Sequence, residues 1–160
     1  MTSNDDRTAG NARFRQLNAA VQEGGPDGDA DLLAALVAEP DRLMAESVLT
    51  SLVDSRAELL GSAASFAAWA EPVLDAVGAD GFMARRVQEW GLFKALQSGA
   101  PVDRAALAAA SNWLQRKVIE GADSPAVLTV LGEVGRTKRV RNLAKTRAGR
   151  LRSQGSVLLG

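Results

Sequence analysis

Short breaks rich in glycine and proline interrupt this 160-residue sequence repeatedly, and they limit every regular element to a modest length. The clearest breaks read EGGPDGDAD, SGAPVD and EGADSP, and the single residues Pro40 and Gly78 also interrupt the pattern. Between the breaks, apolar residues recur at steps of three and four, which is the period of an amphipathic helix. No stretch alternates with period two for more than a few residues, and no Asn-Gly hairpin dipeptide occurs. The pattern therefore predicts an all-α fold of about seven to eight helices.

Capping residues and breaks set the expected helix boundaries. Asp29 or Asp31 can cap the helix that ends before Pro40, and Thr137 can cap the last helix. Pro72 lies inside an expected helix and predicts a kink or a restart there. The expected helices cover residues 11–23, 32–39, 40–60, 62–77, 80–97, 103–120, 125–134 and 137–151.

The length of the chain suits one domain with a real core. Residues 1–10 are polar and unpatterned, so we expect a disordered tail there. Residues 11–153 are expected to form a single all-helical domain, and residues 154–160 a flexible tail.

Two segments carry a repeat-like pattern. In residues 124–151 a proline opens a short apolar helix, a tight turn follows, and the next helix presents Val140, Arg141, Ala144 and Ala148. This resembles the HEAT repeat, whose second helix typically reads Val-Arg-x-x-Ala-x-x-x-Leu, with Ala148 here in place of the last large residue. Residues 29–54 look similar but lack the Val-Arg pair. The resemblance implies stacked helical hairpins that bind other proteins. A short HEAT-like α-solenoid and an irregular helical bundle both remain open.

Charge is distributed unevenly, although the formal net charge of the chain is zero. Residues 1–80 hold 14 Asp and Glu against 5 Lys and Arg, a net charge of −9. Residues 81–133 hold 5 acids and 6 bases, and residues 134–160 hold 8 bases and no acid. Such asymmetry indicates an interaction surface.

Composition argues against most catalytic chemistry. The chain has no Cys, His or Tyr, which removes thiol nucleophiles, thiolate zinc sites and the side chain best suited to proton transfer at neutral pH. Glu71 and Asp75 lie four apart on one helix face, but without a His they are expected to form a solvated acidic face. The stretch GEVGRTKR lacks the Gly-Lys-Thr run of a phosphate loop. We therefore expect no enzyme activity, no cofactor and no bound metal.

The sequence also favours a cytoplasmic protein that does not enter the membrane. No apolar run approaches the roughly 18 residues needed to cross a bilayer, and the first residues lack the apolar core of a secretory signal. Abundant Ala, Arg and Gly, with Ile119 as the single Ile, are associated with bacterial genomes rich in GC.

The basic segment EVGRTKRVRNLAKTRAGRLR, residues 133–152, is the main candidate site. On a helical wheel most of its bases face away from the apolar stripe, but Arg147 falls within the apolar arc. Arg136, Lys138 and Arg139 crowd the first turn, where the helix dipole favours acids. Most of the Trp and Phe residues lie on apolar stripes and are expected in the core, and Trp113, one step off its own stripe, is the best candidate for exposure. The candidate partner-binding residues are Arg136, Lys138, Arg139, Arg141, Lys145, Arg147, Arg150 and Trp113.

These features favour a non-catalytic adaptor that binds a protein with an acidic surface through its helices. Self-association, between the acidic front and the basic back of two copies, is a second possibility. The alternative function is nucleic-acid binding, with residues 127–147 as a helix-turn-helix or as a basic phosphate-binding surface. A solvated end helix with no partner is the remaining interpretation.

Overall fold

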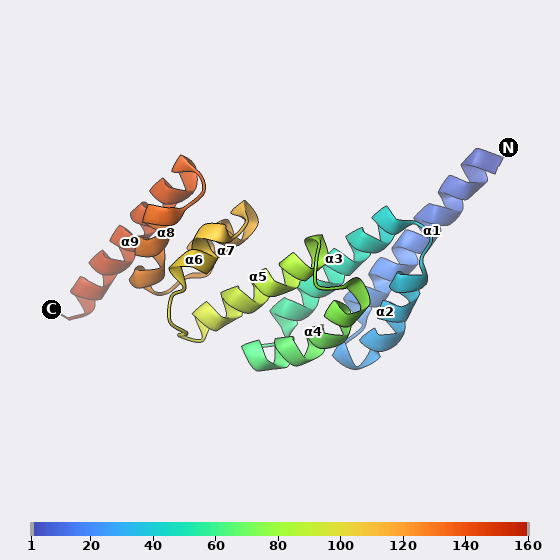
Figure 1. Cartoon of the computed structure of the whole chain (residues 1–160), viewed down its shortest axis with the longest axis horizontal. Helices are drawn as coiled ribbons and strands as arrows, with labels where there is room; N and C mark the ends of the chain where they lie inside the picture. Colours follow the sequence, from blue (N-terminus) through green and yellow to red (C-terminus); the bar gives the residue numbers. More distant parts are fainter. Residues whose placement is uncertain (1, 160) are drawn as a thin grey trace. The chain divides into compact units, whose positions relative to one another are not determined.

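The computed structural model describes residues 2–159, with side chains from Asn4 onward, and this part of the chain contains helices and loops but no strand. The all-α prediction is confirmed (Figure 1). The helices are α1 (Thr2–Glu23), the 3₁₀ turn η1 (Pro26–Gly28), α2 (Asp29–Ala38), α3 (Arg42–Leu59), α4 (Ala63–Val77), α5 (Phe82–Gln97), α6 (Arg104–Ala109), α7 (Asn112–Gly121), α8 (Pro125–Val134) and α9 (Lys138–Leu158).

Side-chain caps fix where many of these helices begin. Each capping oxygen accepts a hydrogen bond from the backbone N–H three residues later, which satisfies one of the free donors of the first turn. The capping residues are Asp41, Ser62, Asp103, Ser111 and Thr137. The predicted cap of the last helix at Thr137 is therefore confirmed.

The chain divides into two compact units, unit 1 (residues 1–88) and unit 2 (residues 89–160). The single domain expected over residues 11–153 stays a prediction. The division falls within α5, so its first half belongs to unit 1 and its second half to unit 2. No break could mark this boundary in the sequence, because the apolar stripe of α5 continues across it.

Unit 1 packs α1, α2 and α4 against α3. Its core is apolar around Val21, Val48, Leu52 and Phe66, which are almost fully buried. α4 continues through Pro72 without the restart that the sequence suggested. Burial of these side chains supplies most of the driving force for folding this unit.

Unit 1 also contains a buried ion pair. Arg56 donates from Nε and Nη2 to the two carboxylate oxygens of Asp29, at 2.7 and 3.0 Å. The indole Nε1 of Trp69 donates to the same carboxylate at 2.9 Å. Asp29 was a candidate helix cap, but Gly28 occupies that position without a side-chain bond. The carboxylate is engaged with Arg56 instead.

Unit 2 packs α6, α7 and α9 around α8. The single helix expected over residues 103–120 is wrong, because α6 ends at Ala109 and α7 starts at Asn112. Ala110 is extended, and the backbone N–H and hydroxyl of Ser111 donate to the Glu89 carboxylate at 2.8 and 2.6 Å. These bonds stabilise a break that contains neither Gly nor Pro, so no local residue pattern predicts it.

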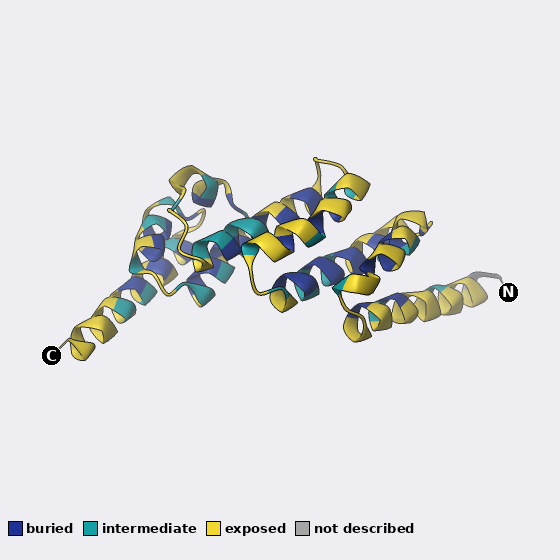
Figure 2. Cartoon of the chain, turned by 90° about the horizontal axis from the view of Figure 1, so that it is seen from below, coloured by how far each residue is buried: buried dark blue, intermediate teal, exposed yellow. Residues whose placement is uncertain are grey.

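Both chain ends are more helical than expected. α1 includes residues 2–10 and α9 continues to Leu158, where the sequence suggested a disordered tail over 1–10 and a flexible tail over 154–160. Most residues of both ends are exposed, as the yellow ribbon in Figure 2 shows. Because these turns bury almost no apolar side chain, they lack the periodic pattern from which a helix is predicted. Met1 and Gly160, which belong to the two expected tails, lie outside the described residues.

Candidate partner-binding surface on the last helix

α8 and α9 form an antiparallel helical hairpin joined by a tight turn at Gly135 (Figure 1). A Cβ at Gly135 would lie 2.9 Å from Cγ1 of Val140, and a Cβ at Gly132 would lie 2.9 Å from Cγ of Lys145. Further along, Arg152 Nη2 donates to Thr129 Oγ1 at 2.7 Å. Later residues of α9 therefore contact earlier residues of α8, as expected for antiparallel helices. Glycine at both positions allows this close approach.

One face of α9 is buried, as the sequence predicted. Val140, Ala144 and Ala148 are almost fully buried in unit 2. The small alanine side chains allow α9 to lie close to its neighbours. Most bases lie on the exposed sides of the helix, so the amphipathic pattern of α9 determines which side packs against the rest of unit 2.

Three of the predicted site arginines bind the carbonyl ends of other helices in unit 2. Arg141 Nη1 donates to the C-cap carbonyl of α8, Gly135 O, at 2.7 Å. Arg147 Nη2 donates to the C-cap carbonyl of α7, Ala122 O, at 3.3 Å. Arg136 Nη1 is 3.5 Å from the C-cap carbonyl of α6, Ala110 O. Carbonyls at helix C-termini carry partial negative charge and lack helical partners, so cations bind there favourably.

The position of Arg147 in the apolar arc thus has a structural explanation. Its guanidinium reaches the end of α7, while its Nε is buried and has no hydrogen-bond partner. A role in binding an external anion is not needed to explain this residue. The backbone N–H of Arg136 is also held, since it donates to Oε1 of the buried Gln115 at 2.9 Å.

The remaining predicted bases are exposed and unpaired. They are Lys138, Arg139, Lys145 and Arg150, which we call the free bases of α9. Within residues 4–159, no base of α9 forms an ion pair. Glu133, at the end of α8, pairs with Arg104 of α6. The free bases of α9 therefore have no carboxylate within ion-pair distance among the described residues.

Arg139 and Arg150 belong to an exposed stripe that also carries apolar groups. Residues 139, 143, 146, 150 and 157 follow one another at helical steps, so they share one side of α9. We call Arg139, Leu143, Thr146, Arg150 and Val157 the outer stripe. Leu143 is 44% exposed and Val157 is 80% exposed. A stripe of bases and apolar residues is typical of a helix that docks in a groove.

Trp113 does not join this surface. It is half-buried in an aromatic cluster, with its ring 5.5 Å from that of Trp90 at a steep angle. Lys117 Nζ lies 4.3 Å from the centre of the Trp90 ring and 5.8 Å from that of Trp113, so the cluster holds a cation of its own. Trp113 is therefore less exposed than expected, because it packs against the Trp90 ring.

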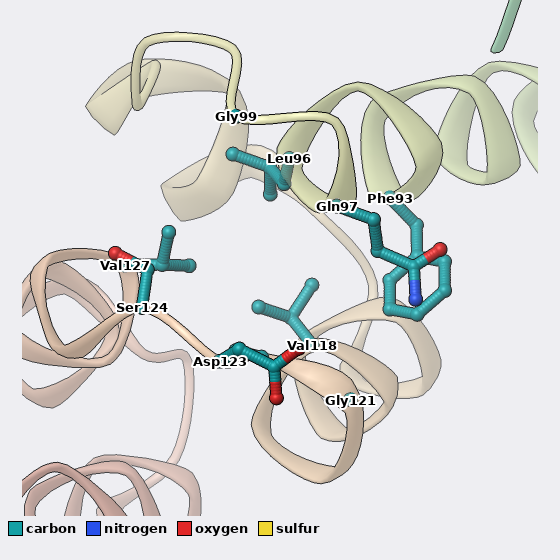
Figure 3. A pocket seen from close by; sticks show the side chains of 10 residues that line it. Phe93, Leu96, Gln97, Gly99, Val118, Gly121, Asp123, Ser124 and Val127 are labelled. Carbon is teal, nitrogen blue, oxygen red and sulfur yellow. The ribbon is translucent and has the colours of Figure 1, made fainter. Parts of the chain in front are cut away.

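Unit 2 also contains a recess with a volume of about 240 Å³ (Figure 3). Phe93, Leu96, Val118 and Val127 supply apolar lining, and Asp123 is the charged residue of the lining. Gln97 and Ser124 also line the recess, so its polar side chains are one carboxylate, one amide and one hydroxyl. Nearby on α5, Lys94 is buried, and desolvation lowers the pKa of its ammonium group.

The described residues contain no cluster of three or more Asp, Glu, Cys or His side chains that could hold a metal ion. Within the same range, no helix has the length and apolar character needed to cross a bilayer.

Comparisons with known proteins found no matching family model, no matching curated protein and no matching solved structure. The functional argument accordingly depends on the geometry of this chain.

Sequence reasoning missed the arginine contacts with helix C-termini. The helical wheel singled out Arg147 alone, because Arg141 falls with the bases that face away from the apolar stripe and Arg136 precedes the helix. The carbonyl groups of Ala110 and Ala122 are distant in sequence from the arginines that bind them. The break between α6 and α7, which leaves Ala110 O at a helix end, was not predicted. Without those partners the two groups of bases cannot be told apart.

Proposed function

We propose that this chain is a non-catalytic interaction protein that binds an acidic surface of another protein through α9. One observation carries the proposal: the free bases are exposed and have no anionic partner within residues 4–159. Like charges on one helix repel one another, and a negatively charged partner relieves this repulsion. A long-range field of this sign also speeds the encounter with an acidic protein.

The apolar members of the outer stripe favour a protein over a simple polyanion. Leu143 and Val157 are exposed between and beyond the bases, where they gain little in contact with phosphates. In a protein groove their burial contributes about 25 cal/mol per Å² of apolar surface. The bases then supply selectivity for an acidic rim.

The helical hairpins support a HEAT-like interpretation, which is part of the proposal. α2–α3 and α8–α9 are antiparallel hairpins, and they fall on the two segments that resemble HEAT repeats, residues 29–54 and 124–151. Repeats of this kind bind partner proteins with surfaces built from successive hairpins. The absence of a catalytic role and a cytoplasmic location, as expected from the sequence, belong to the same proposal.

Nucleic-acid binding by residues 127–147 is the second candidate. The tight turn at Gly135 and the exposed bases of α9 favour it. A DNA-binding helix-turn-helix, however, crosses its helices at roughly 90–120°. α8 and α9 instead stay in contact from Gly135 to Thr129, which suits a hairpin. This geometry favours the protein partner.

The test compares two variants of equal charge change. The α9 variant carries Arg139→Gln, Lys145→Gln and Arg150→Gln. The control variant carries Arg7→Gln, Arg15→Gln and Arg116→Gln, which are also exposed but lie on other helices. The tagged full-length chain and both variants are used to capture partners from lysate of the native cells, with and without nuclease, and the captured proteins are quantified by mass spectrometry.

We expect the wild type and the control variant to retain the same partner proteins after nuclease treatment, and the α9 variant to lose them. Retention of every partner by the α9 variant would refute the proposal. Loss of all partners on nuclease treatment would favour the nucleic-acid candidate. In that case the logarithm of the affinity should fall with the logarithm of salt concentration, with a slope close to the number of phosphate contacts.

A further inference from the structure

The two structural units carry equal and opposite charge. Unit 1 holds 14 Asp and Glu against 7 Lys and Arg, a net charge of −7. Unit 2 holds 5 acids against 12 bases, a net charge of +7. A chain that is neutral overall therefore has two parts with strong fields of opposite sign.

The acids of unit 1 are available at its surface. Three of them are partly or fully buried, and these three pair with arginines: Asp29 with Arg56, Glu39 with Arg13 and Asp54 with Arg86. The other eleven are exposed, and none of these forms an ion pair with a described residue: Asp5, Asp6, Glu23, Asp27, Asp31, Asp41, Glu46, Glu58, Glu71, Asp75 and Asp80. Unit 1 thus presents the kind of surface that the free bases of α9 require.

Unit 1 also has a groove that can receive apolar side chains. It has a volume of about 320 Å³ and lies among α2, α3, α4 and the start of α5. Val37 and Phe82 line it and are 48% and 53% exposed. Glu46 and Asp80 supply its acids, and Arg42, which donates to Val37 O at 3.0 Å, is its base. Exposed apolar surface beside acids matches a helix whose apolar residues lie between bases.

We propose that the acidic partner of α9 is a second copy of this chain, with the outer stripe of one molecule docked in the groove on unit 1 of another. This rests on the proposed function, because it names the partner of the same helix. The two surfaces are unlike, so the contact is heterologous and joins molecules head to tail. Each molecule then offers one basic and one acidic surface, and association continues until a ring closes or the chain of molecules ends.

Charge complementarity favours a second copy over other acidic proteins. The excess of base in one unit equals the excess of acid in the other, so a head-to-tail contact brings together two surfaces whose net charges cancel. The groove adds apolar contacts that a charged surface alone does not supply. Both halves of the interface are present at equal concentration in any solution of the protein.

The experiment uses two complementary variants of the full chain. The groove variant carries Glu46→Gln, Asp80→Asn and Phe82→Ser, all at exposed positions. The α9 variant is the triple substitution defined above. Analytical ultracentrifugation at low ionic strength measures the molar mass of the wild type, of each variant and of their equimolar mixture over a range of concentrations.

We expect the mass of the wild type to rise with concentration and to return to that of a monomer at high salt. Each variant alone should associate at least about tenfold more weakly, because one half of the interface is damaged. The mixture should form a dimer and nothing larger, since one intact pair of surfaces remains. The control variant with Arg7, Arg15 and Arg116 replaced should behave as the wild type.

A wild type that stays monomeric at every concentration at low salt would overturn the inference, as would a mixture that fails to pair. A mass above the monomer that does not change with either variant would also overturn it. These outcomes are distinct from failure of the proposed function. A monomeric chain whose α9 variant still loses captured partners keeps the proposed function and rejects the second copy as partner.

Discussion

The arginines that pair with the buried and half-buried acids of unit 1 differ from the arginines of the last hairpin of unit 2 in the groups that they bind. In unit 1, Arg13, Arg56 and Arg86 each bind a carboxylate, and the pair formed by Arg56 is buried. In unit 2, arginines of the last hairpin donate to neutral carbonyl groups at helix C-termini. The first arrangement cancels charge, whereas the second satisfies hydrogen-bond donors and leaves the positive charge in place.

A basic side chain can therefore form hydrogen bonds while its charge is not neutralised. Arg141 and Arg147 are well bonded, yet unit 2 keeps a net charge of +7. The free bases of α9 lie in the field of these arginines as well as in their own. An interaction surface can therefore be maintained by residues that do not themselves touch the partner.

The largest expected effect concerns the neutralised arginine of unit 1. Asp29→Asn leaves the Arg56 guanidinium buried without a counter-charge, and we expect the free energy of unfolding to fall by about 3–5 kcal/mol. Asp31→Asn is the matched control at an exposed site on the same helix and should change it by no more than about 0.5 kcal/mol. Chemical denaturation measures both. Equal effects of the two substitutions would mean that the buried pair does not stabilise unit 1.

An intermediate effect separates the two groups of bases in unit 2. Arg141→Met removes the 2.7 Å bond to the C-cap carbonyl of α8, and we expect a loss of stability of about 1–2 kcal/mol. Arg139→Met, two residues earlier on the same helix, removes a free base and should change stability by less than about 0.5 kcal/mol. If Arg139→Met destabilised the chain as much as Arg141→Met, the distinction between capping and free bases would fail.

A smaller effect is expected at the start of α9. Lys138 lies in the first turn, where the helix dipole favours an acid, and no acid is present in that turn. Lys138→Glu should stabilise the chain by about 0.3–1 kcal/mol. Lys145→Glu changes the net charge by the same amount, but residue 145 lies in the middle of the helix. Thermal unfolding should therefore give Lys138→Glu a higher Tm than Lys145→Glu. The reverse order would show that the dipole contributes nothing here.

The sequence predicted the fold class well because that depends on local signals. Glycine, proline and capping residues such as Thr137 act on their immediate neighbours, and the apolar period is repeated in each helix. The break at Ser111 could not be predicted, since Glu89, which stabilises it, is 22 residues away. The two-unit division was hidden for a related reason, because it lies within a continuous helix.

The candidate site was predicted in position but not in composition. The concentration of bases in residues 133–152 indicated the correct helix, and the helical wheel separated its buried and exposed faces. Which bases are free depends on carbonyl partners from α6, α7 and α8, and their positions are set by tertiary packing. The half-burial of Trp113 was not predicted either, because it depends on contact with Trp90, which lies on α5.

If no acid of the molecule neutralises the free bases of α9, their mutual repulsion lowers the stability of the chain. The measurement is the difference in the free energy of unfolding between the wild type and the α9 variant, with Arg139, Lys145 and Arg150 replaced by Gln, as salt concentration is varied. Unrelieved repulsion predicts that the variant is the more stable protein at low salt, by about 0.5 kcal/mol or more, and that the difference disappears as salt screens the charges. A variant that is less stable than the wild type at low salt would show that these bases are paired within the chain and would contradict the account.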